Sequence, residues 1–256
     1  NYSIDSRKTV ETRMIDNLTI PVLGEETIFI EEFLDFNEIG AYQLEVWASL
    51  PNGFSDSDES NDTQQTYVTI LQNSAEKNVL LENYTGTWCV YCPRSPIIIE
   101  DLQSIYENKL IVVSHHVNDP LSIPATNELL IAIPSLANGL PSGTIDRYQI
   151  DSNSFSIGVE PEVWNSYISE RINHLSPADI QAQIDFDQIS RKLSIDAKIN
   201  FLTDDLGDLR INAYVTESDI SGYPQANAYQ SDPISFPELY QAGNPILDYQ
   251  HKHVLR

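Results

Sequence analysis

The chain's only two cysteines lie three residues apart, inside the run GTWCVYCP at residues 86–93. Residues 78–84 (NVLLENY), just before this run, have the apolar character of a buried strand. After it, apolar residues at positions 98, 102, 105 and 106 follow the spacing of one helix face. The pattern therefore predicts a strand, a C-x-x-C loop and a helix in that order, an arrangement that makes a thiol reactive.

A cysteine at the start of a helix is chemically activated. The unpaired N–H groups and the dipole of the helix N-terminus stabilise a thiolate there. Pro93 fits the first helical turn, where its missing N–H removes no helix bond, whereas Pro96 should tighten or kink that turn. We predict that Cys89 is the exposed attacking thiolate and that Cys92, one turn inward, resolves the mixed disulfide.

Two other interpretations of the cysteine pair were weighed. As a purely structural disulfide it would be inefficient, because closing a four-residue loop is worth only about 2 kcal/mol in the chain-entropy model. As a zinc site it would need two more ligands, from His115 with His116 or from His251 with His253. Adjacent residues of a strand point to opposite faces, so His115 and His116 do not suit one metal ion. Redox chemistry is therefore favoured.

The charge of the chain limits its partners. Acidic residues number 38 against 14 basic ones, a formal charge of -24, and no part of the sequence reverses this balance. Nucleic acids and anionic membrane surfaces are poor partners for such a chain. No run approaches the ~18 apolar residues of a transmembrane helix. An acidic composition rich in Asn, Ser, Tyr and Ile favours an extracytoplasmic location: the periplasm, the outer-membrane surface or the medium.

Hydrophobic patterning divides the chain into three segments. Residues 1–73 alternate apolar and polar, which predicts an all-β segment. Residues 40–63 resemble the adhesion-type immunoglobulin-like modules of bacterial surface proteins, and the resemblance implies an immunoglobulin-like β-sandwich, incomplete because Asn1 enters partway through the pattern. Its expected strands cover residues 2–4, 18–20, 27–30, 42–48 and 66–71. Residues 177–256 alternate again, with strands expected at 180–186, 193–201 and 209–215, and predict a second, truncated β-sandwich.

Residues 74–176 between them resemble the thioredoxin superfamily, whose active site is W-C-x-x-C at the end of the first core strand. The resemblance implies an α/β thioredoxin-like domain with a helical insertion at 118–138 and a closing helix at 161–174. The fold class expected for the whole chain is this domain flanked by β-sandwich segments, multidomain α+β overall.

The layout is similar to a narrower group, the outer-membrane-protein-related thioredoxin-like surface proteins of Bacteroidetes. In these proteins E-x-x-T-G-x-W-C-x-x-C-P recurs, followed by a β module with an acidic-Ile turn and a terminal H-x-H-V-L-R run. The matching positions here are 84–93, 217–220 and 251–256, within roughly the last two thirds of the chain.

The resemblance also implies a peptide-binding surface. Thioredoxin-like folds carry a cis-proline beside the C-x-x-C, and Pro141 fits that position best, with Pro124 and Pro134 as the next candidates. A cis Leu140–Pro141 bond would turn the Leu140 backbone toward the sulfur atoms. Trp88 and Tyr91 would then form an apolar lip for an extended peptide, captured by backbone pairing.

The chain departs from the thioredoxin pattern at one position. Many thioredoxins place a buried carboxylate six residues before the first cysteine, where this chain has Asn83. Glu82 precedes it and should face the other side of the strand. A built-in base for activating Cys92 is therefore in doubt.

An acidic loop offers a candidate calcium site. Asp56, Asp58 and Asp62 cluster carboxylate oxygens, which hard cations prefer, but the loop lacks the glycine and the last glutamate of an EF-hand. A solvated turn between strands is the default interpretation. Residues 204–208 carry three more aspartates with less support.

Two functions remain in competition. The first is thiol–disulfide exchange through Cys89 and Cys92 on protein or peptide thiols and disulfides, with no cofactor beyond the redox-active disulfide. The second is a non-catalytic cell-surface binding or assembly module that retains the fold; it predicts a buried Cys89.

Overall fold

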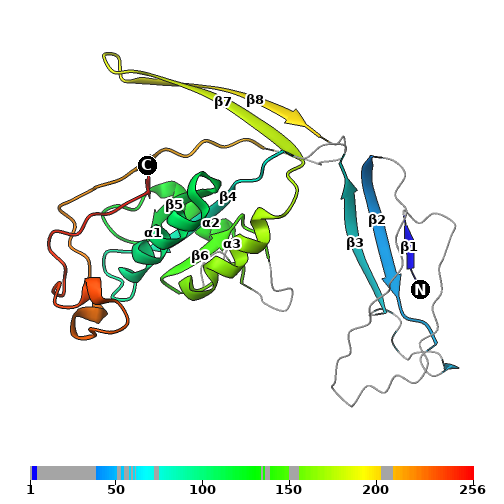
Figure 1. Cartoon of the computed structure of the whole chain (residues 1–256), viewed down its shortest axis with the longest axis horizontal. Helices are drawn as coiled ribbons and strands as arrows, with labels where there is room; N and C mark the ends of the chain where they lie inside the picture. Colours follow the sequence, from blue (N-terminus) through cyan, green and yellow to red (C-terminus); the bar gives the residue numbers. More distant parts are fainter. Residues whose placement is uncertain are drawn as a thin grey trace. The chain divides into compact units, whose positions relative to one another are not determined.

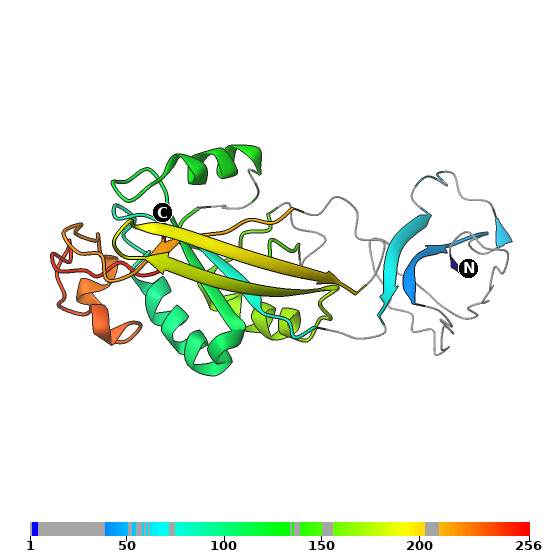
Figure 2. The same ribbon diagram turned by 90° about the horizontal axis from the view of Figure 1, so that it is seen from above.

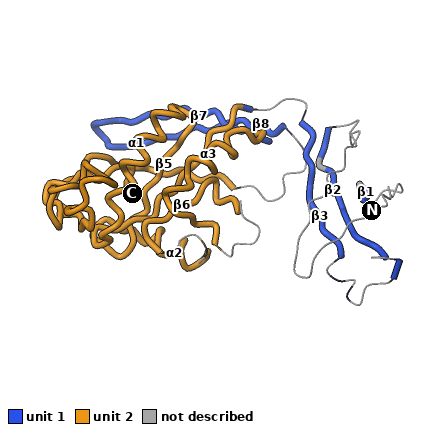
Figure 3. Tube along the Cα trace, turned by 60° about the horizontal axis from the view of Figure 1, so that its bottom comes forward, with its two compact units in different colours: residues 1–75, 176–209 blue, residues 76–175, 210–256 orange. Residues whose placement is uncertain are grey.

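The computed structural model describes residues 2–4, 39–50, 53–54, 58, 60, 62–71, 75–133, 135, 139–149, 156–202 and 210–256. The chain divides into two compact units, each built from two separate stretches (Figure 3). Unit 1 comprises Asn1–Ala75 with Ser176–Leu209, and unit 2 comprises Glu76–Leu175 with Arg210–Arg256.

Unit 1 contains a three-stranded antiparallel sheet in the order β1-β2-β3. Its strands are β1 (Tyr2–Ile4), β2 (Gly40–Trp47) and β3 (Thr63–Ile70). The strands predicted at 2–4, 42–48 and 66–71 are thus confirmed. The strands predicted at 18–20 and 27–30, and with them the full β-sandwich, lie outside the described residues.

Unit 1 also contains a long hairpin, drawn as one two-stranded ribbon in Figure 2. Its strands β7 (Ala178–Asp187) and β8 (Lys192–Phe201) pair antiparallel along their full length. Asp187 Oδ1 accepts the backbone N–H groups of Ile189 and Ser190 and thereby fixes the turn. Both strands were predicted from their period-two alternation.

Unit 2 is built on a five-stranded sheet in the order β6-β4-β5-β10-β9. Its central strands β4, β5 and β10 run parallel, and the outer strands β6 and β9 run antiparallel to their neighbours. The strands are β4 (Val79–Thr85), β5 (Leu110–His116), β6 (Ser142–Ile145), β9 (Thr216–Glu217) and β10 (Val254–Leu255).

Three α-helices accompany this sheet (Figure 1). They are α1 (Arg94–Tyr106), α2 (Pro124–Ala132) and α3 (Trp164–Ile172), with single 3-10 turns η3 (Glu107–Lys109), η5 (Pro161–Val163), η6 (Ala228–Ser231) and η7 (Pro237–Leu239). The helices predicted after the cysteines, in the insertion and at 161–174 are confirmed. In α1, however, Ile99 and Leu102 are buried while Ile105 is exposed, so the buried face is rotated from the predicted one.

The main core of unit 2 lies where α1 and α3 pack on one face of the sheet. Its fully buried members come from β4, β5, β6 and both helices: Val79, Leu81, Ile99, Leu102, Leu110, Val112, Ile145, Trp164 and Ile168. Gly143 of β6 allows the closest approach, because a Cβ built there would lie 2.7 Å from the Trp164 ring. The helix–sheet packing therefore depends on glycine at this position.

The carboxy-terminal segment differs from its prediction. Residues 177–256 do not form one sandwich: the β7–β8 hairpin belongs to unit 1 and residues 210–256 to unit 2. The strand expected at 209–215 is absent from the described residues 210–215, and the next strand along the chain is the two-residue β9. Alternation indicates that a segment can be a strand, but not which sheet it joins. Val254, fully buried in β10, pairs with Ser114 of β5.

Candidate functional site

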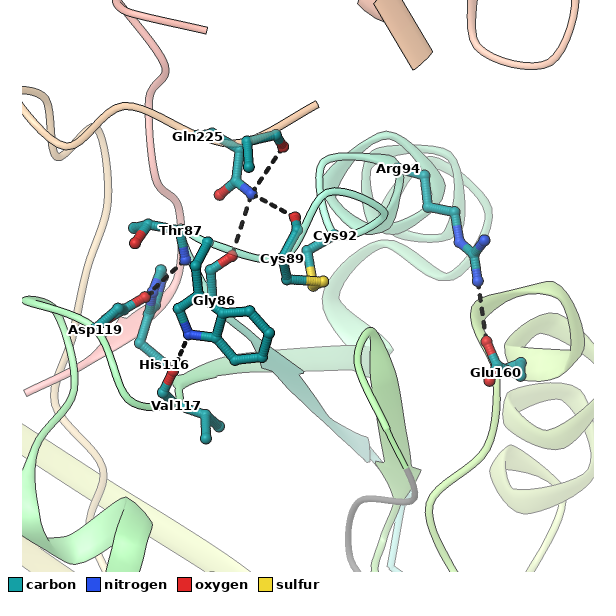
Figure 4. Close-up of a disulfide and its surroundings, with 12 residues drawn as sticks. Gly86, Thr87, Cys89, Cys92, Arg94, His116, Val117, Asp119, Glu160 and Gln225 are labelled. Atoms are coloured by element: carbon teal, nitrogen blue, oxygen red, sulfur yellow. Dashed lines mark hydrogen bonds and ion pairs between the residues drawn. A yellow bond between two sulfur atoms is a disulfide. The ribbon is translucent and has the colours of Figure 1, made fainter. Parts of the chain in front are cut away.

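Cys89 and Cys92 form a disulfide in the loop that joins β4 to α1 (Figure 4). The loop is a series of tight turns: the N–H of Cys89 donates to the Gly86 carbonyl, that of Cys92 to the Cys89 carbonyl at 3.2 Å, and that of Ser95 to the Cys92 carbonyl. Both cysteines are buried, with Cys89 5% and Cys92 1% exposed. The prediction of an exposed Cys89 is therefore wrong for this disulfide form, in which its sulfur is bonded to that of the inward-facing Cys92. The order strand, C-x-x-C, helix is the one predicted.

An apolar rim surrounds the disulfide. Trp88 and Tyr91, the predicted lip residues, are each 53% exposed, and Val90 between the cysteines is exposed as well. The indole N–H of Trp88 donates to the Val117 carbonyl at 2.8 Å, which fixes the orientation of the ring. Such an exposed aromatic rim suits an apolar, extended ligand.

The Leu140–Pro141 bond is cis, as predicted. Pro141 is buried and immediately precedes β6, whose first residue Ser142 is paired with Tyr84 of β4. Pro141 therefore lies at the end of the sheet from which β4 continues into the cysteine loop. Its contact with the sulfur atoms, and the role of Leu140 in binding a peptide, stay predictions.

One side of the cysteine loop is held by Asp119, which sequence reasoning missed. Its Oδ2 accepts the Thr87 N–H at 2.8 Å and lies 2.6 Å from Nδ1 of His116, while Oδ1 accepts the Leu121 N–H. Burial raises the pKa of this carboxyl, but the hydrogen bonds from His116 and Thr87 outweigh it, and the pKa is lowered. Asp119 is thus a fixed negative acceptor that binds the loop at Thr87, two residues before Cys89.

The other side of the loop is held by residues 225–229, which sequence reasoning also missed. The side-chain amide of Gln225 donates to the carbonyls of Gly86 at 3.1 Å and Cys89 at 2.9 Å (Figure 4). The Ala226 and Ala228 N–H groups donate to the carbonyls of residues 87 and 90, both at 2.8 Å. No spacing rule connects positions 89 and 225, so only the folded chain could reveal this contact.

Arg94 places a positive charge two residues after Cys92. Its guanidinium forms ion pairs with Glu160 at 2.9 Å and Glu162 at 3.4 Å and donates to the Tyr229 hydroxyl. The Tyr229 ring in turn meets the edge of Tyr91 at 6.1 Å between centroids. These contacts join the first turn of α1 to the carboxy-terminal segment.

Glu82 and Asn83 lie on opposite faces of β4, as predicted. Asn83 is on the α1 face and donates through Nδ2 to Ser114 Oγ at 3.2 Å. Glu82, fully buried on the other face, pairs with Arg147 through two bonds of 2.6 Å and with His115 at 3.1 Å. Burial alone would raise the pKa of Glu82, but Arg147 and His115 lower it to about 2. The α1 face therefore presents a neutral amide six residues before Cys89.

The candidate metal ligands are not gathered in one place. His115 contacts Glu82 and Thr126, and His116 contacts Asp119 and the ring of His251. Within the described ranges no group of three or more His, Cys, Asp or Glu side chains could hold a metal ion.

The candidate calcium loop is only partly described. Asp58 is exposed and accepts from Ser60, Asp62 is half-buried, and Asp56 lies outside the described residues. The aspartates at 204, 205 and 208 lie outside them too.

Comparison with known proteins gives distant likenesses. No protein-family model matches the chain, and no curated protein matches its sequence. Among solved structures, the chain is similar to HBP35 of Porphyromonas gingivalis, with 21% identity over 72% of this chain, 57% of that protein's length and a TM-score of 0.48. A crystallised Agrobacterium tumefaciens protein gives 12% identity over 72% of each chain, with a TM-score of 0.38. Both TM-scores lie under 0.5, so neither likeness identifies a family or an activity.

The described helices are all too short or too polar to cross a bilayer.

Proposed function

We propose that unit 2 is a thioredoxin-like domain that carries out thiol–disulfide exchange through Cys89 and Cys92, outside the cytoplasm. The observation that carries the proposal is the disulfide between the chain's only cysteines, in the loop that leads from β4 into α1. The connectivity supports the fold assignment: β4, α1 and a parallel β5, then α2, then an antiparallel β6 beside β4, with α3 returning to the α1 face.

The proposed reaction exchanges one disulfide for one dithiol and needs no further oxidant or reductant. In the reduced protein, the Cys89 thiolate attacks one sulfur of a substrate disulfide and forms a mixed disulfide, and the first substrate thiolate leaves. The Cys92 thiolate then attacks the Cys89 sulfur, releasing the second substrate thiolate and closing the Cys89–Cys92 bond. The two thiol protons pass to the substrate thiolates. Run in reverse, the same steps oxidise a substrate dithiol.

The substrate class proposed is an extended peptide or unfolded protein. Trp88 and Tyr91 present apolar rings beside the disulfide, and Leu140 with Pro141 precedes the strand that runs next to β4. A peptide lying along this rim would place its own sulfur near Cys89 and pair its backbone with Leu140.

The test is reduction of a peptide disulfide, with a dithiol as terminal reductant, by the intact chain and by Cys89→Ser. We expect the variant to lose at least ~100-fold of the rate, because the attacking thiolate is removed. Cys92→Ser is the matched variant: it should trap a mixed disulfide between Cys89 and the peptide, visible by mass spectrometry. Equal rates for wild type and Cys89→Ser would refute the proposal.

A second candidate, a binding or assembly module without turnover, is favoured by the burial of Cys89 and by the neutral Asn83. It predicts that reduced Cys89 resists alkylation by iodoacetamide in the native state. Rapid alkylation of Cys89 below neutral pH, reporting a lowered thiol pKa, would decide against it.

A further inference from the structure

The cysteine loop is bound along one side by a segment more than a hundred residues away in sequence. Residues 225–229 run beside it, and hydrogen bonds to the carbonyls of residues 86, 87, 89 and 90 cover four of the loop's acceptors. Two of the four come from one side chain, the amide of Gln225. Since Gln225 is 2% exposed, these bonds do not compete with bulk water.

Gln225 is itself fixed before it reaches the loop. Its backbone exchanges two hydrogen bonds with Ile246, at 3.0 and 2.8 Å. The adjacent Asn227 is tied down too, since its side chain donates to the carbonyls of Leu239 and Gly243. The segment is therefore held in place by its own hydrogen bonds. The Gln225 side chain loses little conformational entropy when its amide binds the cysteine loop.

One of the two loop carbonyls that Gln225 binds, that of Cys89, also closes the C-x-x-C turn. The Cys89 carbonyl accepts the Cys92 N–H at 3.2 Å and the Gln225 amide at 2.9 Å (Figure 4). In the disulfide form the S–S bond also keeps this turn closed. In the dithiol form only noncovalent contacts do so, and the loop gains freedom that weakens its bonds to Gln225.

We propose that Gln225 is a positioning residue for Cys89: its amide holds the C-x-x-C turn closed and so favours the disulfide over the dithiol. This rests on the proposed redox function, because the reduction equilibrium bears on function only if the pair cycles between disulfide and dithiol. An interaction that is stronger in the disulfide form shifts the equilibrium toward that form by its difference between the two states. Gln225 thus sets how readily the pair is reduced without touching the substrate.

The experiment compares Gln225→Met with wild type in equilibrium with mixtures of reduced and oxidised glutathione, followed by alkylation and mass analysis. Methionine keeps the length and volume of the side chain but has no N–H to donate. We expect the equilibrium constant to move about three- to tenfold toward the dithiol, the size of about one net hydrogen bond. Gln230→Met is the matched control: it lies in the same segment with an exposed side chain, and should leave the constant unchanged.

A purely structural role gives a different result. Unfolding midpoints of the oxidised and reduced forms would then fall equally in Gln225→Met, with the glutathione equilibrium unchanged, and the proposal would be overturned. If it holds, the oxidised form loses more stability and the gap between the two midpoints narrows. Should Gln225→Met fail to fold, Gln225→Asn, whose amide is one methylene too short, is read in the same way.

The failure of this inference is distinct from the failure of the redox function. Peptide reduction that depends on Cys89, combined with an unchanged equilibrium in Gln225→Met, refutes only the role of Gln225. A shifted equilibrium in a protein that reduces no peptide refutes only the proposed turnover.

Discussion

The two faces of the unit 2 sheet differ in charge, and the difference is clearest at β4, which sends side chains to both. On the α1 and α3 face, Val79 and Leu81 continue into the apolar core, and the polar side chains that β4 places there are the neutral Asn83 and Thr85. On the other face, Glu82 anchors an ionic cluster with Arg147 and His115. Adjacent residues of one strand thus experience a neutral and a charged environment, both buried.

This difference shows where the chain places its buried charge. A carboxylate on the α1 face would change the electrostatics beneath the start of the helix that carries the cysteines. On the opposite face, the same charge is neutralised by Arg147, and its pKa of about 2 keeps it ionised near neutral pH. Glu82 is therefore a structural ion that points away from the face on which Asn83 lies, rather than a proton acceptor for the cysteine pair.

The largest expected effect comes from removing the partner of Glu82. Arg147→Met leaves the buried Glu82 carboxylate without its main counter-charge, which costs about 3–5 kcal/mol of unfolding free energy at neutral pH. Urea denaturation followed by circular dichroism measures it. Lys109→Met is the control, because Lys109 pairs with Glu76 at the surface, and such pairs are worth only about 0–1 kcal/mol.

The pH dependence of this difference tests its cause. The folded pKa of Glu82, about 2, lies below its unfolded value of 4.5, so its contribution is full above pH 4.5 and is lost as the pH falls toward 2. The stability gap between wild type and Arg147→Met should shrink over this range. A constant gap would show that the loss arises from packing instead.

The next largest effect comes from placing a charge on the neutral face. Asn83→Asp puts a carboxyl where burial disfavours ionisation, so its folded pKa should be raised above the unfolded value of about 3.9. The variant should be nearly as stable as wild type at pH 4 and lose about 2–3 kcal/mol by pH 7, the reverse of the Glu82 dependence. Denaturation at several pH values measures this, and a pH-independent loss would break the comparison.

The smallest of these effects tests the packing of the apolar face. Gly143→Ala places a methyl group against the Trp164 ring, and overpacking of this kind costs about 1–3 kcal/mol. Thermal unfolding measures the loss. Combining it with Trp164→Phe, which shortens the ring, should cost less than the sum of the two single changes; strict additivity would mean that the two side chains do not meet.

The local elements of unit 2 were predictable because their signals are local. Strand β4, the cysteine loop and α1 follow from a contiguous run of apolar residues, two cysteines and a helical repeat. In unit 1, the alternation of apolar and polar residues likewise predicted both strands of the β7–β8 hairpin. Facing residues could also be assigned, since a regular strand must send Glu82 and Asn83 to opposite sides.

The long-range parts were not predictable, because they depend on side chains that carry no signal in sequence. Asp119 lies in a polar segment that also fits a surface loop, and Gln225 in a Pro-, Gln- and Tyr-rich stretch without periodicity. The prediction that residues 210–256 belong to a carboxy-terminal β-sandwich was wrong because their contacts with unit 2 are long-range and leave no signal in the sequence. A two-residue strand such as β10 has too few positions for alternation to indicate its partners.

The place of β10 inside the sheet has a consequence for biosynthesis. Ser114 leaves the ribosome long before His253, whose carbonyl accepts the Ser114 N–H at 2.7 Å. Throughout that interval the inner edge of β5 has no neighbouring strand and presents free backbone groups to other nascent chains. This edge of β5 can therefore be covered by β10 only after the chain has been made through Leu255.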